Sequence, residues 1–118
     1  MKRRNRVMFL EDIIESMNRI ESYLSQVSYD EFSQNQMLID ATVRNLEIIG
    51  EAVRYIPNDL QNEYTSIPWR KMKGLRNILI HKYFGIDEEN VWEIATRNLP
   101  ETKKDIEQMI HGLKKSGH

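Results

Sequence analysis

Apolar side chains recur every three or four residues along most of the chain, which is the spacing of α-helices that bury one face. The first such segment spans about residues 7–27, and the second and longest spans about residues 31–55. We expect Asp30 to cap the second helix and Pro57 to end it. The apolar positions that define the two helices are Val7, Leu10, Ile13, Ile14, Met17, Ile20 and Leu24, then Leu38, Ala41, Leu46, Ile49, Ala52, Val53 and Ile56.

The middle of the chain predicts shorter elements. Residues 58–64 are long enough for one or two helical turns. Pro68 suits the first position of a third helix, because proline has a fixed backbone angle and lacks the N–H that this position does not use. Trp69 is expected to anchor the start of that helix in the core, and Gly85 to end it.

The last third of the chain predicts two more helices. Asp87 is a suitable N-cap for a fourth helix over about residues 88–98. Pro100 is expected to break that helix and to open a fifth, over about residues 101–115. The chain is therefore predicted to be an all-α bundle of four to five helices.

The predicted domain organisation is simple. A length of 118 residues allows one domain and one modest core, and no linker or repeat divides the chain. Residues 1–6 form a basic N-terminal arm, which is either a frayed end or a contact for a nucleic-acid backbone. Residues 115–118 are expected to be a flexible tail.

Composition narrows the function classes. The 17 basic residues nearly balance the 18 acidic ones, so any nucleic-acid binding should be local rather than driven by a large positive field. The absence of cysteine excludes disulfides, thiolate metal sites and a thiol nucleophile, and it fits a cytoplasmic protein. No apolar run approaches a membrane span, so no membrane partner is expected. No metal or cofactor is expected either, since no second histidine stands at ligand spacing.

The longest predicted helix carries a polar stripe and a glycine in its interior. Asp40, Arg44, Glu47 and Glu51 follow one another at steps of four, three and four residues. This stripe is either a solvated face or a face toward the third helix, where Glu47 or Glu51 would orient an arginine of that helix. Gly50 costs about 1 kcal/mol relative to alanine inside a helix, and a close helix crossing would explain it.

The candidate chemistry lies in residues 72–85, which contain the pattern R-N-x-x-x-H-x-Y. On a helix, Asn77 and His81 are neighbours at i and i+4, and Arg76 and Tyr83 share one edge of the same face. Gly74, in the same stretch, permits a second close approach.

These residue types suit phosphodiester chemistry. Arginine binds phosphate oxygens in pairs, histidine exchanges protons near neutral pH, and asparagine can orient the imidazole or hydrogen-bond the substrate. RNA carries its own nucleophile, the 2′-hydroxyl, so a site with a base, an acid and a cation cleaves it without a metal. A two-fold dimer with two copies of His81 in one cleft would supply both the acid and the base.

The pattern Arg76-Asn77-x-x-x-His81-x-Tyr83 resembles the R-x4-H-x-Y signature of HEPN-domain ribonucleases. The surroundings resemble the HepT branch: NLEIIGEA (45–52), IPWRKMKGLRNILIHKYFGID (67–87) and the VW and NLP of residues 91–100 occur in that order. The similarity covers roughly residues 7–113.

The resemblance implies an all-α HEPN fold, a homodimer with a composite cleft, and a metal-independent endoribonuclease. It implies a toxin whose cognate antitoxin is a minimal nucleotidyltransferase (MNT type), in a type VII-like toxin–antitoxin module. Arg76 would bind the scissile phosphate, His81 would be the acid or base, and Asn77 would assist at the catalytic site. The antitoxin would silence the toxin by converting Tyr83 into O-AMP-tyrosine.

Two other functions remain open at this point. One is a non-catalytic HEPN module whose dimer cleft holds a nucleotide or an RNA end, and the near-neutral charge favours it. The other is a helical dimer that only tethers the nucleotidyltransferase. The second predicts that replacing Arg76 or His81 by alanine changes no phenotype.

Overall fold

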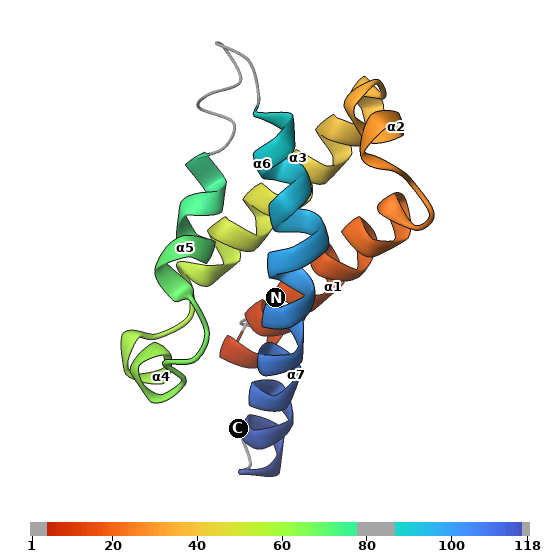
Figure 1. The fold of residues 1–118 in the computed structure, drawn as a ribbon. Helices are drawn as coiled ribbons and strands as arrows, with labels where there is room; N and C mark the ends of the chain where they lie inside the picture. The colour runs from red at the N-terminus through yellow and green to blue at the C-terminus, as the bar shows by residue number, and fades with distance from the viewer. Residues whose placement is uncertain (1–4, 78–86, 117–118) are drawn as a thin grey trace, which may run out of the picture.

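The computed structural model describes residues 5–77 and 87–116, and the described chain is all-α, as predicted (Figure 1). Three long helices form its frame: α1 (Arg6–Leu24), α3 (Gln36–Val53) and α7 (Leu99–Lys115). The shorter elements are α2 (Tyr29–Ser33), α4 (Asn58–Glu63), α5 (Trp69–Lys73), α6 (Glu88–Glu93) and the π-helical turn η2 (Ile94–Asn98). No strand occurs within these described ranges.

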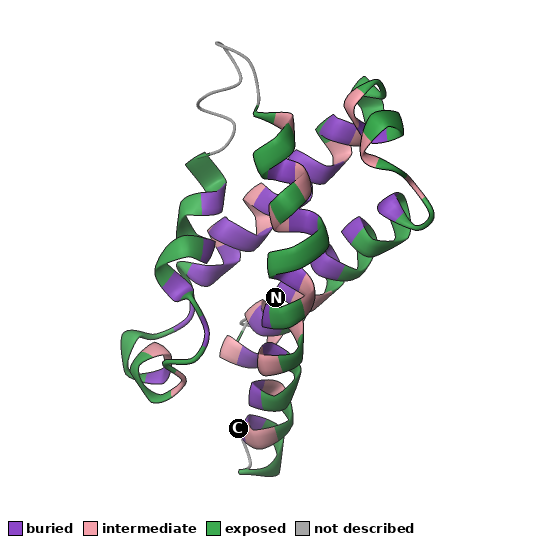
Figure 2. Cartoon of the chain, viewed as in Figure 1, coloured by how far each residue is buried: buried purple, intermediate pink, exposed green. Residues whose placement is uncertain are grey.

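The core lies where α1 packs against α3 and α7. Figure 2 shows the buried residues as stripes along these helices, each helix keeping an exposed outer side. Fully buried side chains come from all three: Leu10, Ile13, Met17 and Ile20 from α1, Ile39, Val43, Leu46, Ile49 and Val53 from α3, and Ile106 and Met109 from α7. Phe32 of α2 and Val91 of α6 extend this core. The predicted apolar positions therefore form one buried layer, with Ile14, Leu38 and Ala41 at its partly buried margin.

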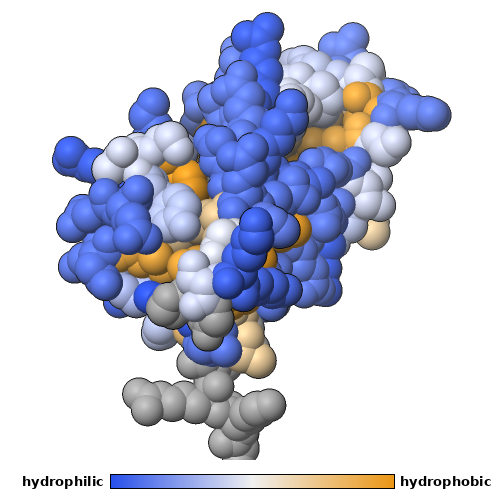
Figure 3. Space-filling model, turned by 90° about the horizontal axis from the view of Figure 1, so that it is seen from below, coloured by the Kyte–Doolittle hydropathy of each residue, from blue (hydrophilic) through white to orange (hydrophobic). Residues whose placement is uncertain are grey.

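The outer surface is largely hydrophilic, with small apolar patches between the polar residues in the view of Figure 3. Two cross-helix ion pairs lie on this surface. Lys103 Nζ of α7 is 3.1 Å from the Glu21 carboxylate of α1, and Lys114 Nζ is 3.0 Å from that of Glu11. None of the described helices is both long enough and apolar enough to cross a membrane.

The predicted single helix over residues 31–55 is wrong, because the chain forms α2 and α3 there. Asn35 adopts an extended conformation and its side chain accepts a hydrogen bond from Leu38 N at 3.1 Å, which starts α3. The cap of α2 is Ser28, not Asp30, and Ser28 forms a reciprocal capping box with Glu31. Short polar side chains such as Asn35 compete with the helix for backbone groups, which explains the break.

The predicted break at Pro100 is also wrong. Helices α6, η2 and α7 follow one another without interruption, and the Leu99 N–H donates to Ile94 O across the wider π turn. Pro100 lies in the first turn of α7. A proline ring clashes with the carbonyl four residues before it in a regular α-helix, and the π turn just before Pro100 accommodates that carbonyl. The predicted cap by Asp87 is confirmed, since its side chain accepts from Asn90 N.

The third predicted helix is shorter than expected within the described residues. Pro68 is the N-cap of α5 rather than its first residue, α5 ends at Lys73, and residues 74–77 form a 3₁₀ turn. The remainder of that prediction, up to Gly85, lies outside the described residues. Trp69 anchors α5 as predicted: it is buried, and its Nε1 donates to Tyr64 O at 3.0 Å.

Candidate functional site

Helix α3 and the end of α5 cross in direct backbone contact at Gly50. A Cβ atom at Gly50 would lie 2.6 Å from Arg76 N, which is closer than Cβ atoms come to other atoms, and 3.1 Å from Met72 O, which is a tight contact. The close crossing predicted from this glycine is therefore confirmed. The approach expected at Gly74 is not, because a Cβ there would meet nothing within 4 Å. The Gly50 contact fixes the backbone of Arg76 against α3.

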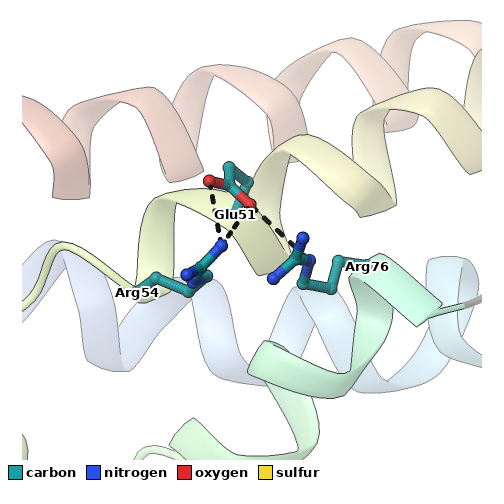
Figure 4. Close-up of polar contacts among 3 residues, drawn as sticks. All are labelled: Glu51, Arg54 and Arg76. Atoms are coloured by element: carbon teal, nitrogen blue, oxygen red, sulfur yellow. Dashed lines mark hydrogen bonds and ion pairs between the residues drawn. The ribbon is translucent and has the colours of Figure 1, made fainter.

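The Glu51 carboxylate lies between two arginines (Figure 4). Its Oε1 atom is 3.6 Å from Arg76 Nε and 3.4 Å from Arg54 Nη1. The three side chains come from the end of α3 and from the 3₁₀ turn that follows α5. Two cations thus share one anion, so the cluster carries a formal net charge of about +1.

The Glu51–Arg76 pair orients more than it stabilises. The two side chains are 46% and 44% exposed, and ion pairs at such exposure contribute at most about 1 kcal/mol. A guanidinium that contacts one anion through Nε can bind a second anion through its two Nη groups. These two groups match the spacing of two phosphate oxygens. The geometry therefore suits an arginine that is held ready to bind a phosphate.

The polar stripe on α3 is partly a solvated face and partly a face toward the third predicted helix. Asp40 and Arg44 are exposed, and Asp40 accepts a hydrogen bond from Gln36 within its own helix. Glu47 and Glu51 are half-buried. The predicted contact with Arg76 is made by Glu51, and Glu47 lies about one turn before it on α3.

The remaining predicted site residues are placed as follows. Asn77 is exposed at the end of the 3₁₀ turn, next to Arg76. His81 and Tyr83 lie outside the described residues. The structure therefore brings together Glu51 and Arg76, while the predicted roles of Arg76, Asn77, His81 and Tyr83 stay predictions.

Arg54 is a site residue that sequence reasoning missed. It stands three residues after Glu51, the spacing at which a helix pairs opposite charges, so the signal was present in the sequence. No group of three histidine, cysteine, aspartate or glutamate side chains within the described part of the chain is arranged to hold a metal ion.

The fold and the site together define an all-α protein that presents an orienting carboxylate and an arginine at a fixed helix crossing. A protein-family model described as "Ribonuclease HepT-like" matches residues 13–109, which include this crossing and the whole R-N-x-x-x-H-x-Y pattern. The chain belongs to the HepT-like ribonuclease family.

Curated relatives agree with this family. The chain is 48% identical over 107 residues to a Methanocaldococcus jannaschii protein named "Putative RNase MJ1380", covering 91% of this chain and 98% of the relative. It is 38% identical over 101 residues to "Probable ribonuclease HepT" of Thermococcus cleftensis, covering 86% and 92%. A Caldanaerobacter subterraneus protein, "Putative RNase TTE0752", is 32% identical over 102 residues, covering 86% and 91%. No solved structure matches the chain.

Proposed function

We propose that the protein is a metal-independent endoribonuclease in which Arg76 binds the scissile phosphate and His81 transfers protons. The observation that carries the proposal is the position of Arg76, whose backbone packs on Gly50 and whose guanidinium contacts Glu51. Membership of the HepT-like ribonuclease family supports the choice of RNA as substrate, as do the names of the relatives.

The reaction needs a base, an acid and a cation that stabilises the charge on the phosphate. A base takes the proton of the 2′-hydroxyl, the freed oxygen attacks phosphorus, and the bond from phosphorus to the 5′-oxygen breaks as an acid protonates that oxygen. The products are a 2′,3′-cyclic phosphate and a 5′-hydroxyl. Arg76 offsets the charge that grows on the phosphate oxygens, and Asn77 orients the imidazole or the substrate. Histidine is the residue type that exchanges protons near neutral pH, so His81 suits this step.

A homodimer completes this mechanism. One chain contributes one His81, and the reaction uses an acid and a base at the same time. Two copies related by a two-fold axis would place two His81 side chains in one cleft, one in each role. On dilution, the dimer should dissociate, and the measured mass should fall from twice 14.1 kDa to the 14.1 kDa of one chain. The proposal expects specific activity to fall over the same concentration range. A monomer with full specific activity would contradict the composite cleft.

In the same proposal, covalent modification of Tyr83 regulates the ribonuclease activity. The protein is the toxin of a two-gene module in the cytoplasm, and its antitoxin is an MNT-type nucleotidyltransferase. The Tyr83 hydroxyl attacks the α-phosphorus of ATP, O-AMP-tyrosine forms, and pyrophosphate leaves. The new phosphate competes with RNA for Arg76, since an arginine fork binds either anion. Incubation with the nucleotidyltransferase and ATP should add one AMP mass to the wild type and none to Tyr83→Phe.

The experiment that tests the activity is cleavage of an end-labelled RNA by the purified chain, beside His81→Ala. The expected result is cleavage with 2′,3′-cyclic phosphate ends by the wild type, and a loss of about a hundredfold or more in the variant, typical of losing a general acid or base. The same sequence with 2′-O-methyl groups, which cannot attack, is the control and should stay intact. Binding of RNA without cleavage would instead favour the non-catalytic HEPN module.

A further inference from the structure

A hollow of about 610 Å³ lies between α4 and α5, on the side of the molecule where these two helices are neighbours (Figure 1). We call it the α4–α5 hollow. Arg70, Lys71 and Lys73 of α5 line it, together with Gln61, Asn62 and Thr65 from α4 and the loop that follows. The three basic side chains belong to exposed residues, as do Asn62 and Thr65. The hollow therefore presents cations together with an amide and a hydroxyl.

The charge of this hollow differs from that of two other hollows on the described surface. Its described lining contains no carboxylate. The groove on the other side of α5 includes Glu101 and Asp105, and the one between α1 and α7 includes Glu11, Glu15 and Glu107. The chain as a whole is nearly neutral, with 17 basic and 18 acidic residues. Positive charge is thus concentrated beside α5, which is the footprint of a local polyanion site.

The basic residues of the hollow are close to Arg76 along the chain. Helix α5 ends at Lys73 and the chain continues as the 3₁₀ turn of residues 74–77, so Lys73 and Arg76 are three residues apart. Side chains at this spacing are neighbours on a helical surface. Residues 69–77 extend over roughly 15 Å at the rises of the two helix types. Four cations, from Arg70 to Arg76, are therefore spaced over a length of chain that corresponds to a few nucleotides.

We infer that the α4–α5 hollow binds the phosphate backbone of the RNA strand on one side of the phosphate held by Arg76. This inference rests on the proposed ribonuclease function. Lysine and arginine contacts to phosphates supply most of the sequence-independent affinity for nucleic acids, and amides and hydroxyls add contacts to phosphate and sugar. The aromatic residue of the hollow, Trp69, is buried with its Nε1 bonded to Tyr64 O, so it offers no stacking surface. The hollow should therefore bind the backbone without selecting bases.

Binding of a fluorescently labelled, 2′-O-methylated 12-nucleotide RNA to the full-length protein tests the inference, because that RNA is not cleaved. The double variant Arg70→Gln/Lys73→Gln removes two cations of the hollow. The matched control, Arg19→Gln/Lys104→Gln, removes two exposed cations of α1 and α7 that do not line the hollow. Affinity should be measured for each protein over a series of salt concentrations, with thermal unfolding to confirm equal folding.

The hollow variant should bind about tenfold more weakly than the wild type, with the slope of log affinity against log salt reduced by about 1.4 for two lost phosphate contacts. The control variant should match the wild type. Equal affinity and slope for both double variants would overturn the inference. That result would instead indicate that the cations of the hollow bind an acidic protein partner. Wild-type cleavage of a dinucleotide, which is too short to reach the hollow, tests the proposed function separately.

Discussion

Gly50 is the residue on which the position of Arg76 depends. Its missing side chain allows the backbone of α3 to contact the backbone of the 3₁₀ turn, with Arg76 N only 2.6 Å from the place of a Cβ atom. Glu51, the next residue, then meets the Arg76 side chain. Two adjacent residues of α3 therefore set both the backbone and the side chain of the arginine proposed to bind phosphate.

Replacing Gly50 by alanine should destabilise the protein. Alanine favours a helix by about 1 kcal/mol over glycine, but the new methyl group would force two backbones apart, and overpacking of this kind costs about 1–3 kcal/mol. We expect a net loss of about 1 kcal/mol in the free energy of unfolding, measured with urea, together with weaker RNA cleavage.

Gly74→Ala is the matched control for that substitution. A Cβ at Gly74 meets nothing within 4 Å, and its φ of −68° suits any residue. Alanine there should be neutral or should stabilise by up to about 1 kcal/mol, since it reduces the freedom of the unfolded chain. Equal effects of the two substitutions would contradict the role of the close crossing.

Replacing Glu51 by glutamine tests whether this carboxylate positions Arg76. The half-exposed ion pairs contribute little to stability, so unfolding should change by less than about 1 kcal/mol. A neutral amide weakens the contact that orients Arg76 but also removes a negative charge beside the substrate phosphate. We therefore expect kcat for RNA cleavage to fall about tenfold while KM stays equal or decreases.

Glu93→Gln provides the comparison for Glu51→Gln. Glu93 forms a similar exposed ion pair, with Arg97 at 3.2 Å, on the π-containing helix. Its loss should leave both kinetic constants unchanged. A purely structural role for Glu51 would give the same result in both variants, or would raise KM without lowering kcat.

Part of the site was predictable residue by residue. A glycine inside a strongly amphipathic helix indicated the crossing, and the spacing of the polar stripe indicated a glutamate near Arg76. Arg54 was missed although its spacing from Glu51 indicated the pair, whereas the open surroundings of Gly74 depend on the angle at which α5 crosses α3. Sequence periodicity does not contain that angle.

Helix boundaries, at the scale of elements, depend on side-chain caps as much as on apolar spacing. No glycine or proline interrupts residues 29–49, but Asn35 caps the start of a new helix and so divides the segment into α2 and α3. At Pro100 the reverse occurs, because a π turn allows the helix to continue where proline predicts a break. Sequence analysis thus gave the buried faces correctly and these two boundaries incorrectly. A capping residue or a proline is compatible with more than one local backbone conformation, and tertiary packing selects among these conformations.

The capping box at the start of α2 gives a test of this element. Ser28 Oγ accepts from Glu31 N at 3.1 Å, and the Glu31 carboxylate accepts from Ser28 N at 2.9 Å. Ser28→Ala removes the first bond and should cost about 1 kcal/mol of stability, the usual effect of losing an N-cap. Ser25→Ala, at an exposed serine just after α1 whose side chain caps no helix start, is the control.

The effect of Ser28→Ala should depend on pH. Hydrogen bonds from the Ser28 backbone and then its side chain lower the pKa of Glu31 below its ordinary value. A lowered pKa stabilises the folded state above the ordinary pKa of glutamate, and this contribution is lost as the pH falls through the folded-state value. Urea unfolding should therefore show a larger difference between Ser28→Ala and the wild type at pH 7 than at pH 3. An equal difference at both would show that the Ser28 hydroxyl does not contribute to the lowered pKa of Glu31.

At the scale of the whole molecule, the buried helices form a scaffold and the proposed site lies on its surface. The core of α1, α3 and α7 holds α3 in place, and α3 in turn holds α5 and Arg76 on the surface. The cations of the α4–α5 hollow and the Glu51 cluster lie on this supported surface, while acidic residues line the hollow between α1 and α7. A nearly neutral protein can therefore present one positive region to an RNA strand.

RNA cleavage in excess EDTA, by protein whose intact mass shows no added AMP, is the most direct test of the central claim. We expect the wild type to cut RNA at an undiminished rate in the chelator, and Arg76→Ala to cut it at least a hundredfold more slowly while folding normally. Lys104→Ala, an exposed cation of α7, should cut RNA as the wild type does. Absence of cleavage by the unmodified wild type, or full activity of Arg76→Ala, would contradict a metal-independent ribonuclease built around Arg76.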